Sequence, residues 1–141
     1  MAGWRVGMVC GRATLLDQIL KVKSNMDSGM FYGIQKGAIA ALQLNKNWFD
    51  GQNEIYRNRR KLVFELADKL QCSYDKNAVG MFVWAKLPRH LTDDEAFVNE
   101  ILYDKNLFIT PGSIFGSNGS GYVRFSLCID NNKITEAISR F

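Results

Sequence analysis

Apolar residues recur at the spacing of an α-helix through most of the first half of the chain. Before that pattern begins, the alternating segment 4–10 predicts a β-strand, which ends at a glycine. Three helices are then expected, over 14–26, 30–44 and 47–71. The first and third have an apolar stripe along one face, and the second is apolar and rich in glycine and alanine. The first half therefore predicts one strand followed by three helices.

The second half of the chain changes to β-prone sequence. Strands are predicted in VGMFVWAKLP, residues 79–88, then over 107–110 and 122–129, because aromatic and β-branched residues are concentrated there. Helices are predicted over 93–103 and 131–141. This order, β-α-β-β-α after the three helices, favours an α/β fold of α+β character in which helices cover one side of a small, mainly antiparallel sheet.

Three polar residues are spaced as helix caps. Thr14 precedes Asp17 by three residues, and Thr92 precedes Glu95 by the same distance, the spacing of a capping box. Asn47 stands at the predicted start of the long third helix. We therefore expect Thr14, Asn47 and Thr92 to begin their helices.

Composition excludes several classes of protein. The chain has 141 residues, of which 47% are apolar, 12% aromatic and 23% charged, so it is neither disordered nor low in complexity. No apolar run approaches the roughly 18 residues that span a bilayer, and no secretory signal is seen, so neither a membrane nor an export route is indicated. The cysteines, Cys10, Cys72 and Cys128, suit reduced, buried thiols of a cytoplasmic protein, and their spacing is not that of a metal site.

Basic residues are in excess, with a formal net charge of +4. Part of this excess lies in the run RNRRK, which contains Arg57, Arg59, Arg60 and Lys61. A nucleic-acid-binding patch is one interpretation. A solvated helix face is the favoured one, because the run is short and no aromatic residues alternate with it.

Other polar features are better explained without catalysis. The loop GSNGSG, 116–121, precedes a strand rather than a helix, so it fits a hairpin connection and not a phosphate-binding loop. His90 has no partner in a recognisable motif and is expected in a surface loop. Asp93 and Asp94 are expected to be first-turn charges of a helix rather than a catalytic pair.

Arg5 and Arg124 stand out because each interrupts an apolar, strand-like context. A guanidinium among apolar neighbours needs acceptors for its five N–H donors. Each arginine could lie on the solvent face of an edge strand. The alternative is a pair of anion sites, because the planar guanidinium binds carboxylate or phosphate through two hydrogen bonds.

Four motifs give the chain a resemblance to a known family. They are MAGWRVG at 1–7, VGMFVWAKLP at 79–88, TPGSIFG at 110–116 and GSGYVRFSL at 119–127. In this order and spacing the chain resembles the C-terminal portion of fold-type I aminotransferases of class I/II, which depend on pyridoxal 5′-phosphate (PLP). The resemblance covers essentially the whole chain. It implies that 1–46 is the C-terminal segment of a large PLP-binding domain, and that 47–141 is a long interdomain helix and a small C-terminal domain.

The same resemblance implies roles for the two arginines. Arg5 matches the residue that binds the cofactor phosphate, and Arg124 the residue that binds the substrate α-carboxylate. The lysine that holds PLP covalently would lie four residues before Met1, so no catalytic residue is assigned within the chain, which we expect to be inactive alone. The full-length enzyme would be a homodimer that moves an amino group between an amino acid and a 2-oxo acid. A lyase of the same fold, acting by β-elimination or decarboxylation, is the alternative.

Overall fold

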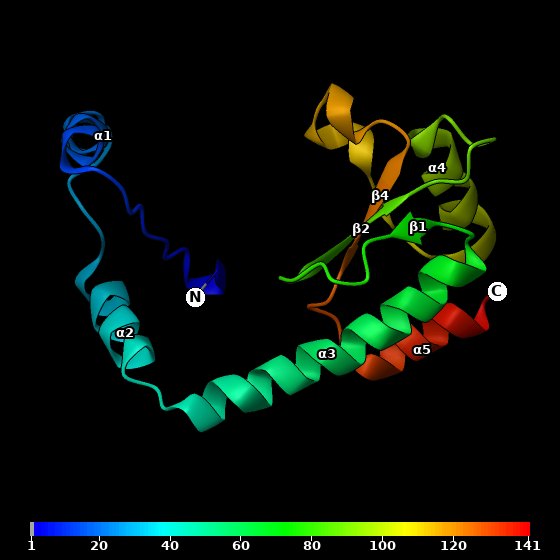
Figure 1. Ribbon diagram of the computed structural model, residues 1–141, viewed down its shortest axis with the longest axis horizontal. Coiled ribbons are helices and arrows are strands. Elements are labelled where there is room, and N and C mark those ends of the chain that lie inside the picture. The colour runs from blue at the N-terminus through cyan, green and yellow to red at the C-terminus, as the bar shows by residue number, and fades with distance from the viewer. Residues whose placement is uncertain (1) are drawn as a thin grey trace. The chain divides into compact units, whose positions relative to one another are not determined.

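The computed structural model describes residues 2–141, which form two compact units (Figure 1). The first unit ends at Phe49, and the second comprises Asp50–Phe141. Helix α3, Lys46–Lys69, begins in the first unit and continues in the second. The assignment of 1–46 and 47–141 to two domains of an aminotransferase stays a prediction.

The first unit contains the 3-10 turn η1, Ala2–Trp4, and the helices α1, Ala13–Met26, and α2, Tyr32–Leu42. The predicted strand over 4–10 is wrong, because no β-strand is assigned in this unit among the described residues. A strand needs a neighbour to accept and donate its main-chain hydrogen bonds. Neither α1 nor α2 has a buried residue.

Two of the predicted helix caps fall in this part of the chain, and both are wrong. The N-cap position of α1 is Arg12, which makes no side-chain cap hydrogen bond, and Thr14 lies within the helix. At the start of α3, Asn45 rather than Asn47 acts as the cap, because the Oδ1 of Asn45 accepts from the backbone N–H of Trp48 at 3.1 Å. Both helices thus begin earlier than predicted.

The second unit is built on a four-stranded antiparallel sheet. Its strands are β1, Ser73–Tyr74, β2, Phe82–Lys86, β3, Thr110–Pro111, and β4, Tyr122–Ser126, in the order β1-β2-β4-β3. The predicted antiparallel sheet is confirmed, and so is the hairpin connection that contains GSNGSG, since β3 pairs with β4. The short strand β1 was not predicted, because two residues give no alternating pattern.

Burial alternates along β2 and β4, so one face of the sheet is covered and the other is open. The covered face packs against α3, α4, Asp94–Lys105, and α5, Asn131–Ser139, which supply residues to a single hydrophobic core. The prediction of helices on one side of the sheet is therefore confirmed. The core comprises Val63, Leu66, Ala67, Leu70, Cys72, Val83, Ala85, Leu87, Val98, Ile101, Ile109, Val123, Phe125, Leu127, Ile134, Ala137 and Ile138.

The N-cap of helix α4 is Asp93 rather than the predicted Thr92. The carboxylate of Asp93 accepts a hydrogen bond from the backbone N–H of Ala96 at 2.9 Å, which satisfies one of the free donors of the first turn. Asp93 is therefore the cap rather than the first-turn charge that the sequence predicted, and Asp94 lies in the first turn.

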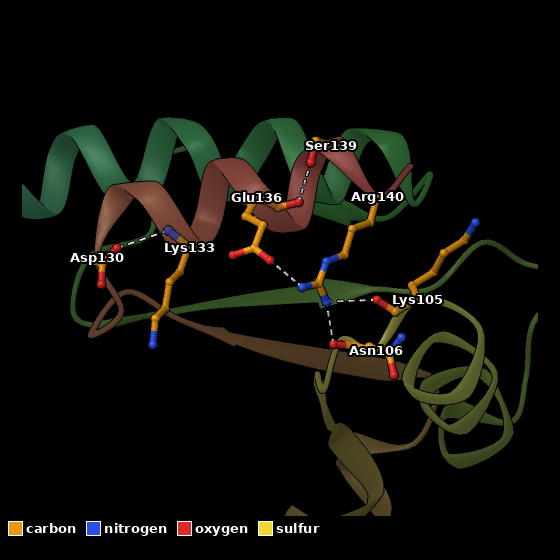
Figure 2. A network of polar contacts seen from close by, with 7 residues as sticks. All are labelled: Lys105, Asn106, Asp130, Lys133, Glu136, Ser139 and Arg140. Carbon is orange, nitrogen blue, oxygen red and sulfur yellow. Dashed lines mark hydrogen bonds and ion pairs between the residues drawn. The ribbon is translucent and has the colours of Figure 1, made fainter.

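Arg140 joins the end of α5 to the end of α4 (Figure 2). Its Nη1 donates to the carbonyl oxygens of Lys105, at 2.9 Å, and Asn106, at 2.6 Å, and its Nη2 donates to Glu136 at 2.6 Å. Asn106 ends α4 in the left-handed conformation, with φ of 49°. Arg140 thus satisfies carbonyl groups that a helix C-terminus leaves without partners.

The basic run RNRRK is only partly the solvated face that the sequence favoured. Arg57 is exposed and pairs with Glu54. Arg59 and Arg60 are half-buried: Arg59 donates to the carbonyl of Leu127 at 3.0 Å, and Arg60 donates to main-chain carbonyls of the 78–80 segment. The prediction is therefore wrong for these two arginines, whose charge is directed toward backbone dipoles.

The three cysteines are free thiols. Cys72 is buried as predicted, and burial raises its pKa to about 11. Cys10 and Cys128 are exposed, so the prediction of buried thiols is wrong for both. His90 lies exposed in a turn, as expected.

Candidate functional site

Arg124 lies on the open face of the sheet, in the middle of β4. It is opposite Trp84 of β2 and opposite Thr110 of β3. The neighbouring residues of β4, Val123 and Phe125, are buried in the core, so the alternation of the strand turns Arg124 away from the core. Because β4 lies between β2 and β3, both neighbouring strands pair with the backbone around Arg124.

Two phenyl rings contact the guanidinium of Arg124. Its Cζ lies 4.3 Å from the ring centroid of Phe82 and 4.4 Å from that of Phe115. Trp84 contacts Phe115 edge-on, with 5.7 Å between centroids, and stacks on Tyr122 at 5.6 Å. The charge of Arg124 is thus held beside π-faces, which attract cations.

No carboxylate of the described chain pairs with Arg124, and its Nε is buried without a hydrogen-bond partner. A guanidinium has five donors, and burying a donor without an acceptor costs about 1–3 kcal/mol. The Nε atoms of Arg59 and Arg60 are buried in the same way, but their Nη groups donate to backbone carbonyls, whereas Arg124 has no acceptor for its N–H groups among the described residues. A planar anion such as a carboxylate supplies acceptors in the geometry that arginine matches.

Phe115 reaches this site from the connection between β3 and β4, which contains the 3-10 turns η2, Gly112–Phe115, and η3, Ser117–Gly119. Asp94 anchors both ends of this connection. Its Oδ2 accepts from the backbone N–H of Ser113 at 2.8 Å, and its Oδ1 accepts from the backbone N–H of Gly121 at 3.1 Å.

Asp94 is a buried charge, with 3% of its surface exposed. Burial acts to raise its pKa, but the hydrogen bonds from Ser113 and Gly121 favour the carboxylate and outweigh burial, so the pKa lies below the ordinary 3.8. Asp94 is therefore more than the first-turn charge that the sequence predicted. It holds the β3–β4 connection in place from the start of α4.

Two glycines close the same connection. A Cβ added to Gly112 would lie 2.1 Å from the carbonyl oxygen of Gly119, and one added to Gly119 would lie 1.9 Å from that of Gly112. Real Cβ atoms do not approach backbone so closely, so only glycine fits at either position.

Arg5 belongs to the first unit and lies in a turn, with φ of 57°, rather than in the predicted strand. Its side chain is exposed, and no carboxylate among the described residues pairs with it. It borders a hollow together with Ser24, Ser28 and the ion pair of Lys23 with Asp27. These are donors of the kind that an anion requires, apart from the carboxylate of Asp27.

The structure describes Arg5 and Arg124 in separate units, each by itself. Around Arg124, sequence reasoning missed Phe82, Phe115 and Asp94. The alternation of β2 places Phe82 and Trp84 on the face of the sheet opposite the buried Val83, a signal that was available. No local sequence pattern predicts the contact of Phe115 with Arg124, because the contact depends on the path of the ten-residue connection between β3 and β4.

Among the residues that the structure describes, no helix is sufficiently long and apolar to cross a membrane. Within the same residues, no three His, Cys, Asp or Glu side chains are grouped as metal ligands.

A sequence model of the family described as aminotransferase class I and II matches residues 1–141. The chain belongs to this family. Among curated proteins, it is 39% identical over 140 residues to the LL-diaminopimelate aminotransferase of Maridesulfovibrio salexigens, covering 99% of the chain and 36% of that protein. The chain thus spans about a third of the length of the aminotransferases that it matches.

Solved structures of the family share the fold. The apo structure of BacF from Bacillus subtilis matches with a TM-score of 0.83 and 30% identity, over 99% of this chain and 36% of BacF. An aminotransferase from Staphylococcus aureus matches with a TM-score of 0.81 and 31% identity, over 99% of this chain and 37% of that one. The fold class expected from the sequence is thereby confirmed.

Proposed function

We propose that this chain forms the part of a PLP-dependent aminotransferase that binds the α-carboxylate of the substrate, with Arg124 as the carboxylate-binding residue. The supporting observation is the unpaired guanidinium of Arg124, fixed on the open face of the sheet with a buried Nε that has no acceptor. A carboxylate bound in two prongs would satisfy these donors.

Arg5 is the residue of this chain that we assign to the cofactor. Arg5 is exposed and has no carboxylate partner among the described residues, so it can bind the phosphate group of PLP. When bound, PLP withdraws electrons from the Cα of the amino acid. None of the lysines in this chain is assigned to the cofactor, so we expect no turnover by the chain alone.

Arg124 contributes orientation rather than proton transfer. Two N–H···O bonds in one plane fix both the position and the rotation of the carboxylate, and with them the direction of the adjacent Cα–H bond. Because every amino acid and 2-oxo acid carries this carboxylate, the same arginine serves both substrates. The proposal includes a homodimer in the cytoplasm, with an amino acid and a 2-oxo acid as substrates.

The test uses the PLP-loaded enzyme that contains this chain. LL-diaminopimelate is the first amino acid to try, because the curated relatives carry its name. Arg124→Lys should lower kcat/KM about 10- to 100-fold for the amino acid and for the 2-oxo acid, since a charged hydrogen bond contributes about 1.5–3 kcal/mol. Arg89→Lys, at an exposed turn position, is the matched control and should change neither value.

Two results would contradict the proposal. If Arg124→Lys and Arg89→Lys behave alike toward both substrates, Arg124 does not bind the carboxylate. If the enzyme releases ammonia or carbon dioxide stoichiometrically instead of transferring the amino group, it is a lyase of the same fold. Product analysis by NMR separates these reactions.

A further inference from the structure

Two phenylalanines on different elements contact the same guanidinium. Phe82 belongs to β2 and lies diagonally across the sheet from Arg124, because Phe82 pairs with Ser126 and Trp84 with Arg124. Phe115 comes from η2 and is braced by Trp84. The two phenyl rings are called the Phe82–Phe115 pair below.

The pair is not needed to fill the core. Phe82 is 40% exposed and Phe115 is 50% exposed, and neither belongs to the hydrophobic core. Half-exposed aromatic side chains that contact a cation are stabilised in place by that cation–π contact rather than by burial. Here the rings contact a guanidinium that has no carboxylate partner among the described residues.

An arginine side chain has many rotamers, and binding a ligand with it normally costs about 0.5–1.5 kcal/mol of ordering. A guanidinium held against two π-faces has already lost most of that freedom. The rings contact its Cζ and make no hydrogen bond to its N–H donors, which lie in the plane of the guanidinium. Only a ligand that approaches in that plane can accept two hydrogen bonds at once.

We propose that Phe82 and Phe115 are positioning residues that hold the guanidinium of Arg124 in one orientation for a planar carboxylate. This inference rests on the role given to Arg124 under the proposed function. It adds that the recognition of the carboxylate depends on two side chains that make no hydrogen bond to it.

The test follows the Nε–H and Nη signals of Arg124 by NMR in the 141-residue chain, without cofactor. Signals are assigned by their loss in Arg124→Lys. In Phe82→Leu and Phe115→Leu, rotation about the Nε–Cζ bond should become about 2- to 5-fold faster per ring, as expected from the loss of a cation–π contact of about 0.5–1 kcal/mol. Phe82→Tyr and Phe115→Tyr keep an aromatic ring, so in these variants the guanidinium of Arg124 should rotate as slowly as in the original chain.

Acetate is the binding probe, titrated at constant ionic strength. Its affinity for Arg124 should fall about 2- to 10-fold in each leucine variant, because the ordering cost returns to the binding step. Tyr103→Leu removes an exposed ring on α4 and is the matched control, with no change expected. The amide spectrum of each variant confirms that the sheet is intact.

Unchanged rotation of Arg124 in both leucine variants overturns the positioning role. Equal losses in the leucine and tyrosine variants also overturn it, because the ring would then not be the cause. If rotation accelerates as expected but acetate never shifts the Arg124 signals, the positioning of Arg124 stands. In that case the carboxylate-binding role in the proposed function is the part that fails.

Discussion

Asp94 and Ser113 are 19 residues apart in the sequence, and a hydrogen bond of 2.8 Å joins the carboxylate of one to the backbone N–H of the other. The second oxygen of Asp94 accepts from Gly121. This one side chain therefore fixes both ends of the connection that delivers Phe115 to Arg124. Asp94 thereby links the first turn of α4 to Arg124, through the connection and its Phe115.

Asp94→Asn should destabilise the second unit. Asparagine has one carbonyl oxygen, so one of the two backbone N–H groups loses its acceptor, at a cost of about 1–3 kcal/mol in the free energy of unfolding. Urea unfolding followed by circular dichroism measures this change. Asp104→Asn, at an exposed position of α4, is the control and should remain within about 0.5 kcal/mol. Equal stability of both variants would show that Asp94 does not anchor the connection.

The contribution of Asp94 should also depend on pH. Its pKa is lower in the folded chain than the ordinary value of 3.8, so the unfolded state binds the proton more readily. The stabilisation is thus fully present above pH 3.8 and is lost as the pH falls through the folded-state pKa. The gap in unfolding free energy between the original chain and Asp94→Asn should be largest near neutral pH and narrow toward pH 3. A gap that stays constant over this range would contradict the pKa shift.

Arg60→Ala should cost more stability than Arg57→Ala, although both remove one positive charge from the same helix. Arg60 donates to the carbonyls of Ala78 and Gly80, at 2.5 Å each, and its removal loses both hydrogen bonds, each of which contributes about 0.5–1.5 kcal/mol. Arg57 is an exposed partner of Glu54, and its loss should cost at most about 0.5 kcal/mol. Thermal unfolding compares the two variants, and the reverse ranking would refute the anchoring role of Arg60.

The three thiols should differ in reactivity toward a disulfide reagent at pH 8. Burial raises the pKa of Cys72 to about 11, so it carries almost no thiolate at this pH and is inaccessible. Cys10 and Cys128 are exposed and should react rapidly. Spectrophotometric titration should count two fast thiols, with the third released by denaturant. Three fast thiols would mean that the core around Cys72 opens readily.

The first unit of the 141-residue chain should lose its structure before the second. Helices α1 and α2 bury no residue, whereas the hydrophobic core draws all its members from Val63 onward. Amide exchange protection follows buried contacts. Mass spectrometry of exchanged peptides should therefore show rapid exchange in residues before Phe49 and slow exchange in β2, β4 and α5. Comparable protection in α1 would contradict this expectation.

Residue type was sufficient to predict the main strands of the sheet. The strands around Val83 and Val123 were predicted because aromatic and β-branched residues are concentrated there, and in the structure their burial alternates. The strand over 4–10 failed because an apolar alternating pattern says nothing about whether a neighbouring strand exists. Helix caps failed by one or two residues, since several nearby polar side chains could compete for the same backbone donors. Arg124 could be singled out from its apolar context, but its ring partners depend on tertiary structure.

The tight contact of Gly112 with Gly119 has a consequence for how a ligand would meet this face of the sheet. This contact joins Gly112 to Gly119, and Asp94 joins Ser113 to Gly121, so two links hold the β3–β4 connection together. A flexible lid would have to be ordered when the ligand arrives, and that entropy would oppose binding. Here the contacts that order the connection form on folding, so we expect no such entropy cost for Phe115 and its neighbours when a ligand reaches Arg124.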